Sequence, residues 1–166
     1  MFLKYYQSII SLIIAFLALP LVSTAQNMGS VTLVVTNSAY VSGTINAFLW
    51  DNAEKFPRSK KEYFSMRTAI AGSDSLKFVF NNLPYGNYAI SVFCDENENK
   101  EFDRSLIRGI SEPFALSGQP DYNNPPVKFE DCSFVVDSAI HTIQLKLLSQ
   151  KELNAIRDSL QHSKNR

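Results

Sequence analysis

The sequence predicts an all-β fold, a single sandwich of about seven strands followed by a short C-terminal helix. Three observations predict it. Short segments with apolar side chains at every second position recur between Val31 and Leu147. Clusters rich in Gly, Pro, Asn and Ser separate these segments. Beyond Leu148 the apolar spacing changes to three and four residues, which is the period of a helix that buries one face.

Several short segments carry the strand pattern. In one of them Tyr88, Ile90, Val92 and Cys94 share one face. We expect strands at 31–36, 44–50, 76–80, 88–94, 134–136 and 140–147, with 64–71 as a further candidate. Residues 81–87 predict a turn, because Pro84 presets φ and Gly86 accepts a positive φ.

Two internal regions lack this pattern. Residues 51–63 are polar and basic around Phe56, which is typical of a solvated loop. Residues 104–126 show no periodicity, and a stretch of that length inside a compact domain is usually functional or ordered by something else. At the C-terminus, Leu153, Ile156 and Leu160 predict an amphipathic helix that docks on the sandwich, mediates self-association or frays.

The first 25 residues are typical of a signal peptide. Lys4 precedes an apolar stretch at 9–22, and small residues at 23–25 favour cleavage before Gln26. The stretch has about 14 residues, fewer than the roughly 20 that span a bilayer. We therefore expect a secreted or periplasmic protein with no stable membrane span after cleavage, made of a signal peptide (1–25), a β-sandwich domain (26–148) and a helical tail (149–166). The alternative is a membrane anchor formed by an uncleaved N-terminal segment.

Charge balance and motif content argue against two function classes. The 16 Lys and Arg residues are matched by 16 Asp and Glu residues, whereas a nucleic-acid binder normally has a basic excess. No G-x-S-x-G, H-E-x-x-H or Gly-rich phosphate loop occurs in the sequence. His141 is in phase with Ile143 and Leu145 of a predicted strand, as expected for a packed residue rather than a catalytic base. We expect neither nucleic-acid binding nor enzyme activity.

Oxygen-bearing side chains recur at every second position directly after the 88–94 strand. They are Asp95, Asn97, Asn99, Glu101 and Asp103. In a tightly turned loop alternate side chains converge on one centre, and Ca²⁺ takes six to eight such oxygens. The spacing matches the opening of an EF-hand loop. It departs later, because Lys100 stands at the Gly position and Leu106 at the position of the closing Glu.

This loop has two interpretations. In the first it is a β-sandwich calcium loop, with Glu101 contributing its carbonyl, the other four residues their side chains, and Glu112 as a further candidate ligand. In the second it is an acidic turn that is held by its own side-chain-to-backbone hydrogen bonds and binds no metal. The two cysteines, Cys94 and Cys132, are equally open: after export they either form one disulfide or stay buried as small apolar residues.

Four motifs in this order resemble a family of exported bacterial proteins, the domain of unknown function 2141. The motifs are Tyr88-Ala89 running to Cys94-Asp95, then Glu96-Asn97-Glu98-Asn99 with Asp103, then Gly109 to Ser117, then Pro125-Pro126-Val127-Lys128-Phe129-Glu130-Asp131. The resemblance covers roughly 31–147. It implies a secreted sandwich of the prealbumin-like or immunoglobulin-like kind, with no established activity.

The departures from the family pattern concern the cysteines. Cys94 takes the place of a His, and Cys132 takes the place of an Ala. Because both changes produce the only two cysteines of the chain, the comparison implies a Cys94–Cys132 disulfide, worth roughly 3–4 kcal/mol for a loop of about 37 residues.

The sequence thus favours an exported, non-catalytic binding or accessory module of the cell envelope, stabilised by Ca²⁺ in the 95–103 loop. Its partner would be an envelope protein or a glycan. The alternative is a purely structural domain that holds no metal and associates with itself through the C-terminal helix.

Overall fold

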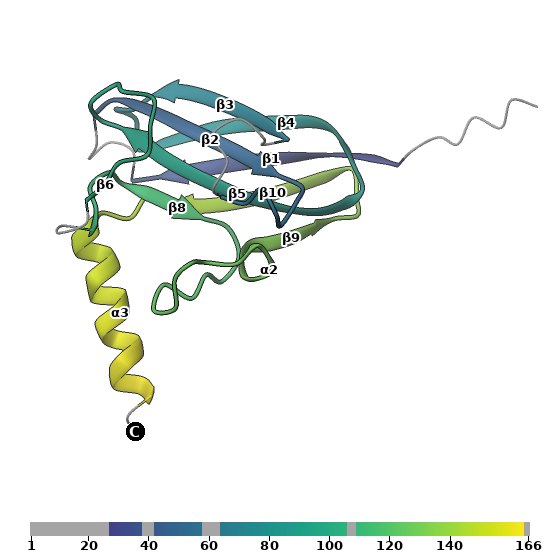
Figure 1. The fold of residues 1–166 in the computed structure, drawn as a ribbon. Coiled ribbons are helices and arrows are strands. Elements are labelled where there is room, and N and C mark those ends of the chain that lie inside the picture. The colour runs from purple at the N-terminus through teal and green to yellow at the C-terminus, as the bar shows by residue number, and fades with distance from the viewer. Residues whose placement is uncertain (1–26, 38–41, 58–63, 106–108, 165–166) are drawn as a thin grey trace, which may run out of the picture.

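The computed structural model describes residues 27–37, 42–57, 64–105 and 109–164, and the predicted signal peptide lies outside them. Two β-sheets pack face to face, and the last helix leaves one end of the sandwich (Figure 1). The all-β sandwich with a C-terminal helix is therefore confirmed.

The smaller sheet has the order β10-β1-β4. Its strands are β1 (Met28–Thr36), β4 (Ser75–Pro84) and β10 (Ile140–Lys146). β1 is antiparallel to β4 and parallel to β10, with Val31 opposite His141. The first strand of the domain is therefore held by the last.

The larger sheet has the order β3-β2-β5-β8, and β9 also pairs with β5. Its strands are β2 (Thr44–Trp50), β3 (Ser65–Ile70), β5 (Gly86–Asp95), β8 (Phe114–Leu116) and β9 (Ser133–Val136). β2 occupies one edge of β5. β8 and β9 share the other, β8 along residues 91–93 and β9 along residues 86–89. A separate pair, β6 (Arg104–Ser105) and β7 (Gly109–Ile110), follows the loop after β5.

The alternating side chains meet between the two sheets as the sequence predicted. Tyr88, Ile90, Val92 and Cys94 all lie in this core. They pack against residues of the facing strand β1, Val31, Leu33 and Val35, which are fully buried. Burial of each large side chain stabilises the fold by about 1.5–3 kcal/mol.

The predicted turn at 81–87 is shorter than expected. β4 continues through Pro84 and β5 starts at Gly86, so only Tyr85 lies between them. The residue with a positive φ is Asn82 (56°), at an irregularity where β4 carries one extra residue opposite β1. The positive φ that the sequence predicts for a turn thus occurs in a β-bulge.

A second cluster of apolar residues covers the outer face of the larger sheet. Trp50, Phe56, Ala89 and Cys132 are its buried members. Phe56 is only 4% exposed, so this side chain of the predicted solvated loop packs on the sheet, whereas Asp51, Ala53 and Glu54 are exposed. Phe129 from the short helix α2 (Phe129–Cys132) packs on the same cluster.

The C-terminal helix α3 (Gln150–Lys164) docks through its first turns. Ser149 and Glu152 form a capping box: the Glu152 N–H donates to Ser149 Oγ (3.3 Å), and the Ser149 N–H donates to the Glu152 carboxylate (2.9 Å). Leu153 is fully buried, and Arg157 Nε donates to the carbonyl of Tyr122 (3.0 Å). Among the expectations for this helix, docking is the one the structure supports.

None of the helices in the described part of the chain is long and apolar enough to cross a membrane.

Candidate functional site

The loop after β5 is wound around the carboxylate of Asp95. This residue is only 2% exposed, and its two oxygens accept hydrogen bonds from the N–H groups of Asn99 (3.1 Å) and Lys100 (2.8 Å). Asn97 Oδ1 also accepts from the Asn99 N–H (3.1 Å), and Asn99 Oδ1 accepts from the Glu101 N–H (2.7 Å). The side chains at 95, 97 and 99 therefore hold the backbone of their own loop, which is the hydrogen bonding expected in the second interpretation.

The side chains of the loop converge on a second carboxylate, that of Asp103. Asn97 Nδ2 donates to it at 2.7 Å, and Asn99 Nδ2 donates to both of its oxygens at 3.1 Å. The structure thus brings the side chains of Asn97, Asn99 and Asp103 together. The Asp95 side chain binds the backbone of the loop instead, and the Glu101 side chain is exposed. The amide groups supply the partial positive charge that a cation would supply in the first interpretation of this loop.

The residue at the expected Gly position does not prevent the turn. Lys100 adopts a positive φ of 64°, which is the left-handed conformation that Gly usually supplies. A glycine is required nearby instead. Gly43 has φ 121°, and a Cβ there would collide with the carbonyl oxygen of Asp95. The loop therefore packs directly on the backbone that precedes β2.

Glu112 lies outside the 95–103 segment but hydrogen-bonds to both ends of the loop. It is 4% exposed, and its two oxygens accept from the N–H groups of Glu96 (3.1 Å) and Asp103 (3.0 Å). Burial raises the pKa of Glu112, and the Asp103 and Asp95 carboxylates raise it further, while the two hydrogen bonds oppose the shift. Leu106, at the closing position of an EF-hand, lies outside the described residues. Glu112 is the described residue that bridges both ends of the loop.

This arrangement determines what the loop can hold. Among the described residues, no three or more His, Cys, Asp and Glu side chains are grouped so that they could hold a metal ion. A cation here would therefore need the amide oxygens of Asn97 and Asn99 and the carbonyl of Glu101 besides the carboxylates. Such oxygens are ordinary ligands of Ca²⁺. The calcium site stays a prediction.

An aromatic row anchors the loop to the larger sheet. Phe102 contacts Phe93 (5.5 Å between ring centroids) and Phe114 (5.9 Å). From there ring contacts extend in both directions over eight residues: Phe129, Phe56, Trp50, Phe48, Phe93, Phe102, Phe114 and Tyr122. A rearrangement of the loop would therefore reach the only tryptophan through two intervening phenylalanines, Phe93 and Phe48.

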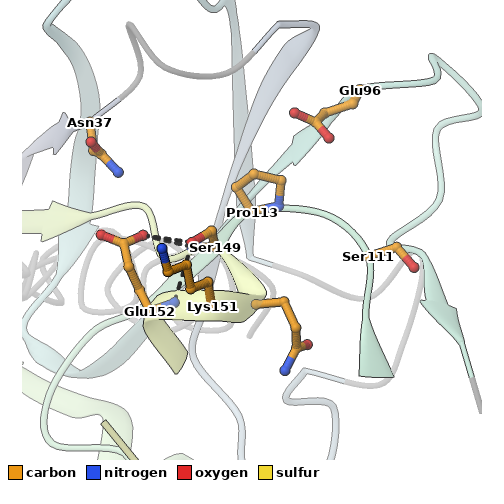
Figure 2. Close-up of a pocket in the computed structure, with 8 residues that line it drawn as sticks. Asn37, Glu96, Ser111, Pro113, Ser149, Lys151 and Glu152 are labelled. Atoms are coloured by element: carbon orange, nitrogen blue, oxygen red, sulfur yellow. Dashed lines mark hydrogen bonds between the residues drawn. The ribbon is translucent and has the colours of Figure 1, made fainter. Parts of the chain in front are cut away.

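A shallow hollow of about 600 Å³ lies beside the loop. Figure 2 shows Glu96 and Ser111 on one side of Pro113, and Ser149 and Glu152 of the helix cap on the other. Seven of the eight residues that line it have polar or charged side chains. The hollow is therefore lined by the 95–103 loop and by the start of α3.

Both cysteines are free, so the predicted disulfide is wrong. Cys94 faces the core between the sheets, whereas Cys132 lies in the outer cluster. Cys132 precedes Ser133, which pairs with Ala89. Cys94 lies five residues further along β5, about 16 Å at 3.3 Å per residue, whereas a disulfide needs Cα atoms within about 7 Å. Burial raises the pKa of both thiols to about 12.

Comparisons with known proteins show to which family the chain belongs. A family profile described as an uncharacterized protein conserved in bacteria, DUF2141, matches residues 33–144. The chain belongs to the DUF2141 family. No curated protein is significantly similar in sequence. A fimbrial assembly protein from Parabacteroides distasonis ATCC 8503 is similar in structure, with a TM-score of 0.41 and 5% identity. The similarity covers 75% of this chain and 54% of that one, so the chain spans about half the length of that protein.

The segments that carried the resemblance to DUF2141 have physical roles in the structure. Glu112 joins the two ends of the loop. Ser117, which is 1% exposed, accepts from the Ile90 N–H (2.7 Å) and donates to the Cys132 carbonyl (2.6 Å). Ser117 could not be recognised from the sequence, because no local pattern shows that a serine after β8 will meet two other segments.

Proposed function

We propose that this DUF2141 protein is an exported, non-catalytic module of the cell envelope whose 95–103 loop binds Ca²⁺. The observation that carries the proposal is the contact of Asn97 and Asn99 with the Asp103 carboxylate, in a loop that is wound around the Asp95 carboxylate. Glu112 lies behind them, and three of these five side chains are carboxylates. Like charges held close together are costly, and a divalent cation offsets that cost.

A non-catalytic role is supported by the one Ser–His–Asp grouping that the described hydrogen bonds contain. Ser138 Oγ lies 2.9 Å from His141 Nε2, and Asp137 Oδ1 lies 3.5 Å from the same nitrogen. In a catalytic triad the hydroxyl and the carboxylate meet different ring nitrogens, so that the histidine is oriented by one and accepts a proton from the other. Here both compete for Nε2.

The partner we propose is an envelope protein or a glycan that contacts the loop and the hollow beside it. Glu96 and Lys151 line that hollow from the loop and from α3. Both have exposed side chains of opposite charge. A polar partner would meet hydrogen-bonding groups from two segments that are far apart in the sequence.

Thermal unfolding of the purified protein in EDTA and in millimolar Ca²⁺ tests the metal site. A ligand at 100 times its Kd stabilises the folded state by about 2.7 kcal/mol. We expect a rise in Tm with Ca²⁺ that is abolished by Asp103→Asn. The matched control is Glu98→Gln, because this side chain belongs to the same loop and is exposed. Curves that superimpose in EDTA and Ca²⁺ would refute the calcium site.

A second candidate function follows from the shape of the tail. The C-terminal part of the helix α3 leads away from the sandwich (Figure 1), and Ile156 is half-buried. The structural alternative predicts self-association through this helix. Light scattering over a range of protein concentrations separates the two: a monomer at every concentration supports the binding module. An oligomer that Ile156→Glu dissociates supports the alternative.

A further inference from the structure

The turn between β9 and β10 is closed by the imidazole of His141. The N–H groups of Asp137 and Ser138 both donate to Nε2, each at 3.2 Å, and the Ser138 hydroxyl lies 2.9 Å from it. A ring nitrogen that accepts an N–H carries no proton. These contacts fit the ring tautomer that carries its hydrogen on Nδ1.

The same turn holds the start of β1. The backbone N–H and the hydroxyl of Ser30 both donate to the carbonyl of Ala139, at 2.9 and 3.0 Å. Gly29 packs against the carbonyl of Ser138, where a Cβ would collide with it. The turn is therefore one of two contacts that hold the first residues of β1, the other being their pairing with the end of β4.

A second proton on the ring would reverse these contacts. Protonated Nε2 is a donor, and it would then face two backbone N–H donors. Among the described residues, the charged group recorded against Nε2 is the Asp137 carboxylate, with Oδ1 at 3.5 Å from it. The neighbouring strand β1 presents Ser30 and Val31 at this level, and neither titrates. The imidazolium would donate to Asp137, and the two N–H groups would lose their acceptor.

We propose that His141 is a pH-sensitive latch for the N-terminal end of the domain. In its neutral form it closes the 137–139 turn, and the turn clamps β1. In its protonated form it pairs with Asp137, the turn opens and the first residues of β1 loosen. This device lies at the opposite end of β5 from the 95–103 loop, because β9 pairs with residues 86–89. It is thus independent of the proposed calcium site.

Amide hydrogen exchange of the ¹⁵N-labelled protein at pH 8 and pH 5, expressed as protection factors, tests the latch. We expect the protection of the Asp137, Ser138 and Ser30 amides to fall about tenfold at pH 5, the change that the loss of one hydrogen bond produces. In His141→Gln the side-chain oxygen accepts without titrating, so protection should not change with pH. The matched control is His162→Gln in α3, which should behave like the wild type.

Two results would overturn the latch. The first is wild-type protection at these amides that does not change between pH 8 and pH 5. The second is the same pH dependence in His141→Gln, which would show that the imidazole is not the group responsible. Ring ¹⁵N shifts of the wild type give an independent test that needs no variant. They should show the Nδ1–H tautomer at pH 8, and the opposite tautomer would contradict the proposal.

Discussion

Removing the hydroxyl of Ser117 should destabilise the sandwich more than any other loss of a single oxygen described above. The hydroxyl lies where β8 ends and β9 takes over the same edge of β5. It accepts from the Ile90 N–H (2.7 Å) and donates to the Cys132 carbonyl (2.6 Å). The side chain is 1% exposed, so water cannot replace it without a rearrangement.

The magnitude follows from the two groups that Ser117→Ala leaves without this partner. Each unsatisfied buried polar group costs about 1–3 kcal/mol, so the free energy of unfolding should fall by about 2–6 kcal/mol. The matched control is Ser133→Ala. That hydroxyl also donates to a nearby carbonyl, that of Glu130 (3.1 Å), but its bond is exposed to solvent. The control should change the free energy by less than about 0.5 kcal/mol.

Urea unfolding followed by the fluorescence of Trp50 measures both variants. This residue is the only tryptophan of the chain and is 3% exposed. We expect a lower midpoint for Ser117→Ala with an unchanged slope, since the slope reports the surface exposed on unfolding. A loss below about 1 kcal/mol, indistinguishable from the control, would refute the role assigned to this hydroxyl.

Three further predictions concern the loop, the helix cap and the thiols. Gly43→Ala should cost several kcal/mol more than Gly72→Ala in urea unfolding, because both have φ near 121° but only Gly43 would collide with a neighbouring backbone; equal losses would contradict this. The Lys146 and Ser149 hydrogen bonds lower the pKa of Glu152 to about 2, so its contribution is present above the ordinary range near 4.5 and is lost as the pH falls toward 2. Melting curves of Glu152→Gln should therefore differ most from the wild type at neutral pH and converge near pH 2, and a constant difference would count against the assignment. Cys94 and Cys132 should be unreactive to a thiol reagent in the native protein and both reactive in guanidinium. If the unfolded protein showed no reactive thiol, the two cysteines would have to form a disulfide.

Much of the fold could be predicted because alternation directly encodes which side of a strand is buried. The segment at 44–50 has the predicted bounds, and the inward face of β5 is correct to the residue. Pattern reasoning failed where a segment was too short to alternate. β8 has only three residues, Phe114–Leu116, and lies inside the stretch that showed no periodicity. Its pairing with β5 depends on how distant segments of the chain come together, which a local pattern does not show.

The candidate site, too, could be predicted only in part. The spacing of Asp95, Asn97 and Asn99 predicted an inward-turned loop, because side chains two apart in a tight turn reach the same region. The disulfide failed because the sequence does not show on which face of the larger sheet Cys132 lies. That face depends on α2, a four-residue helix with no periodic signal of its own.

The parallel pairing of β1 with β10 has a consequence for when the chain can fold. Paired residues such as Val31 and His141 are 110 positions apart, so the smaller sheet is incomplete until nearly the whole domain has been synthesised. Contacts between such distant residues require a large loop to close first, and proteins dominated by them fold slowly. A chain that must stay unfolded to be translocated benefits from that delay. In an exported protein, as proposed here, the topology that completes the sandwich would also postpone folding until the last strand has crossed the membrane.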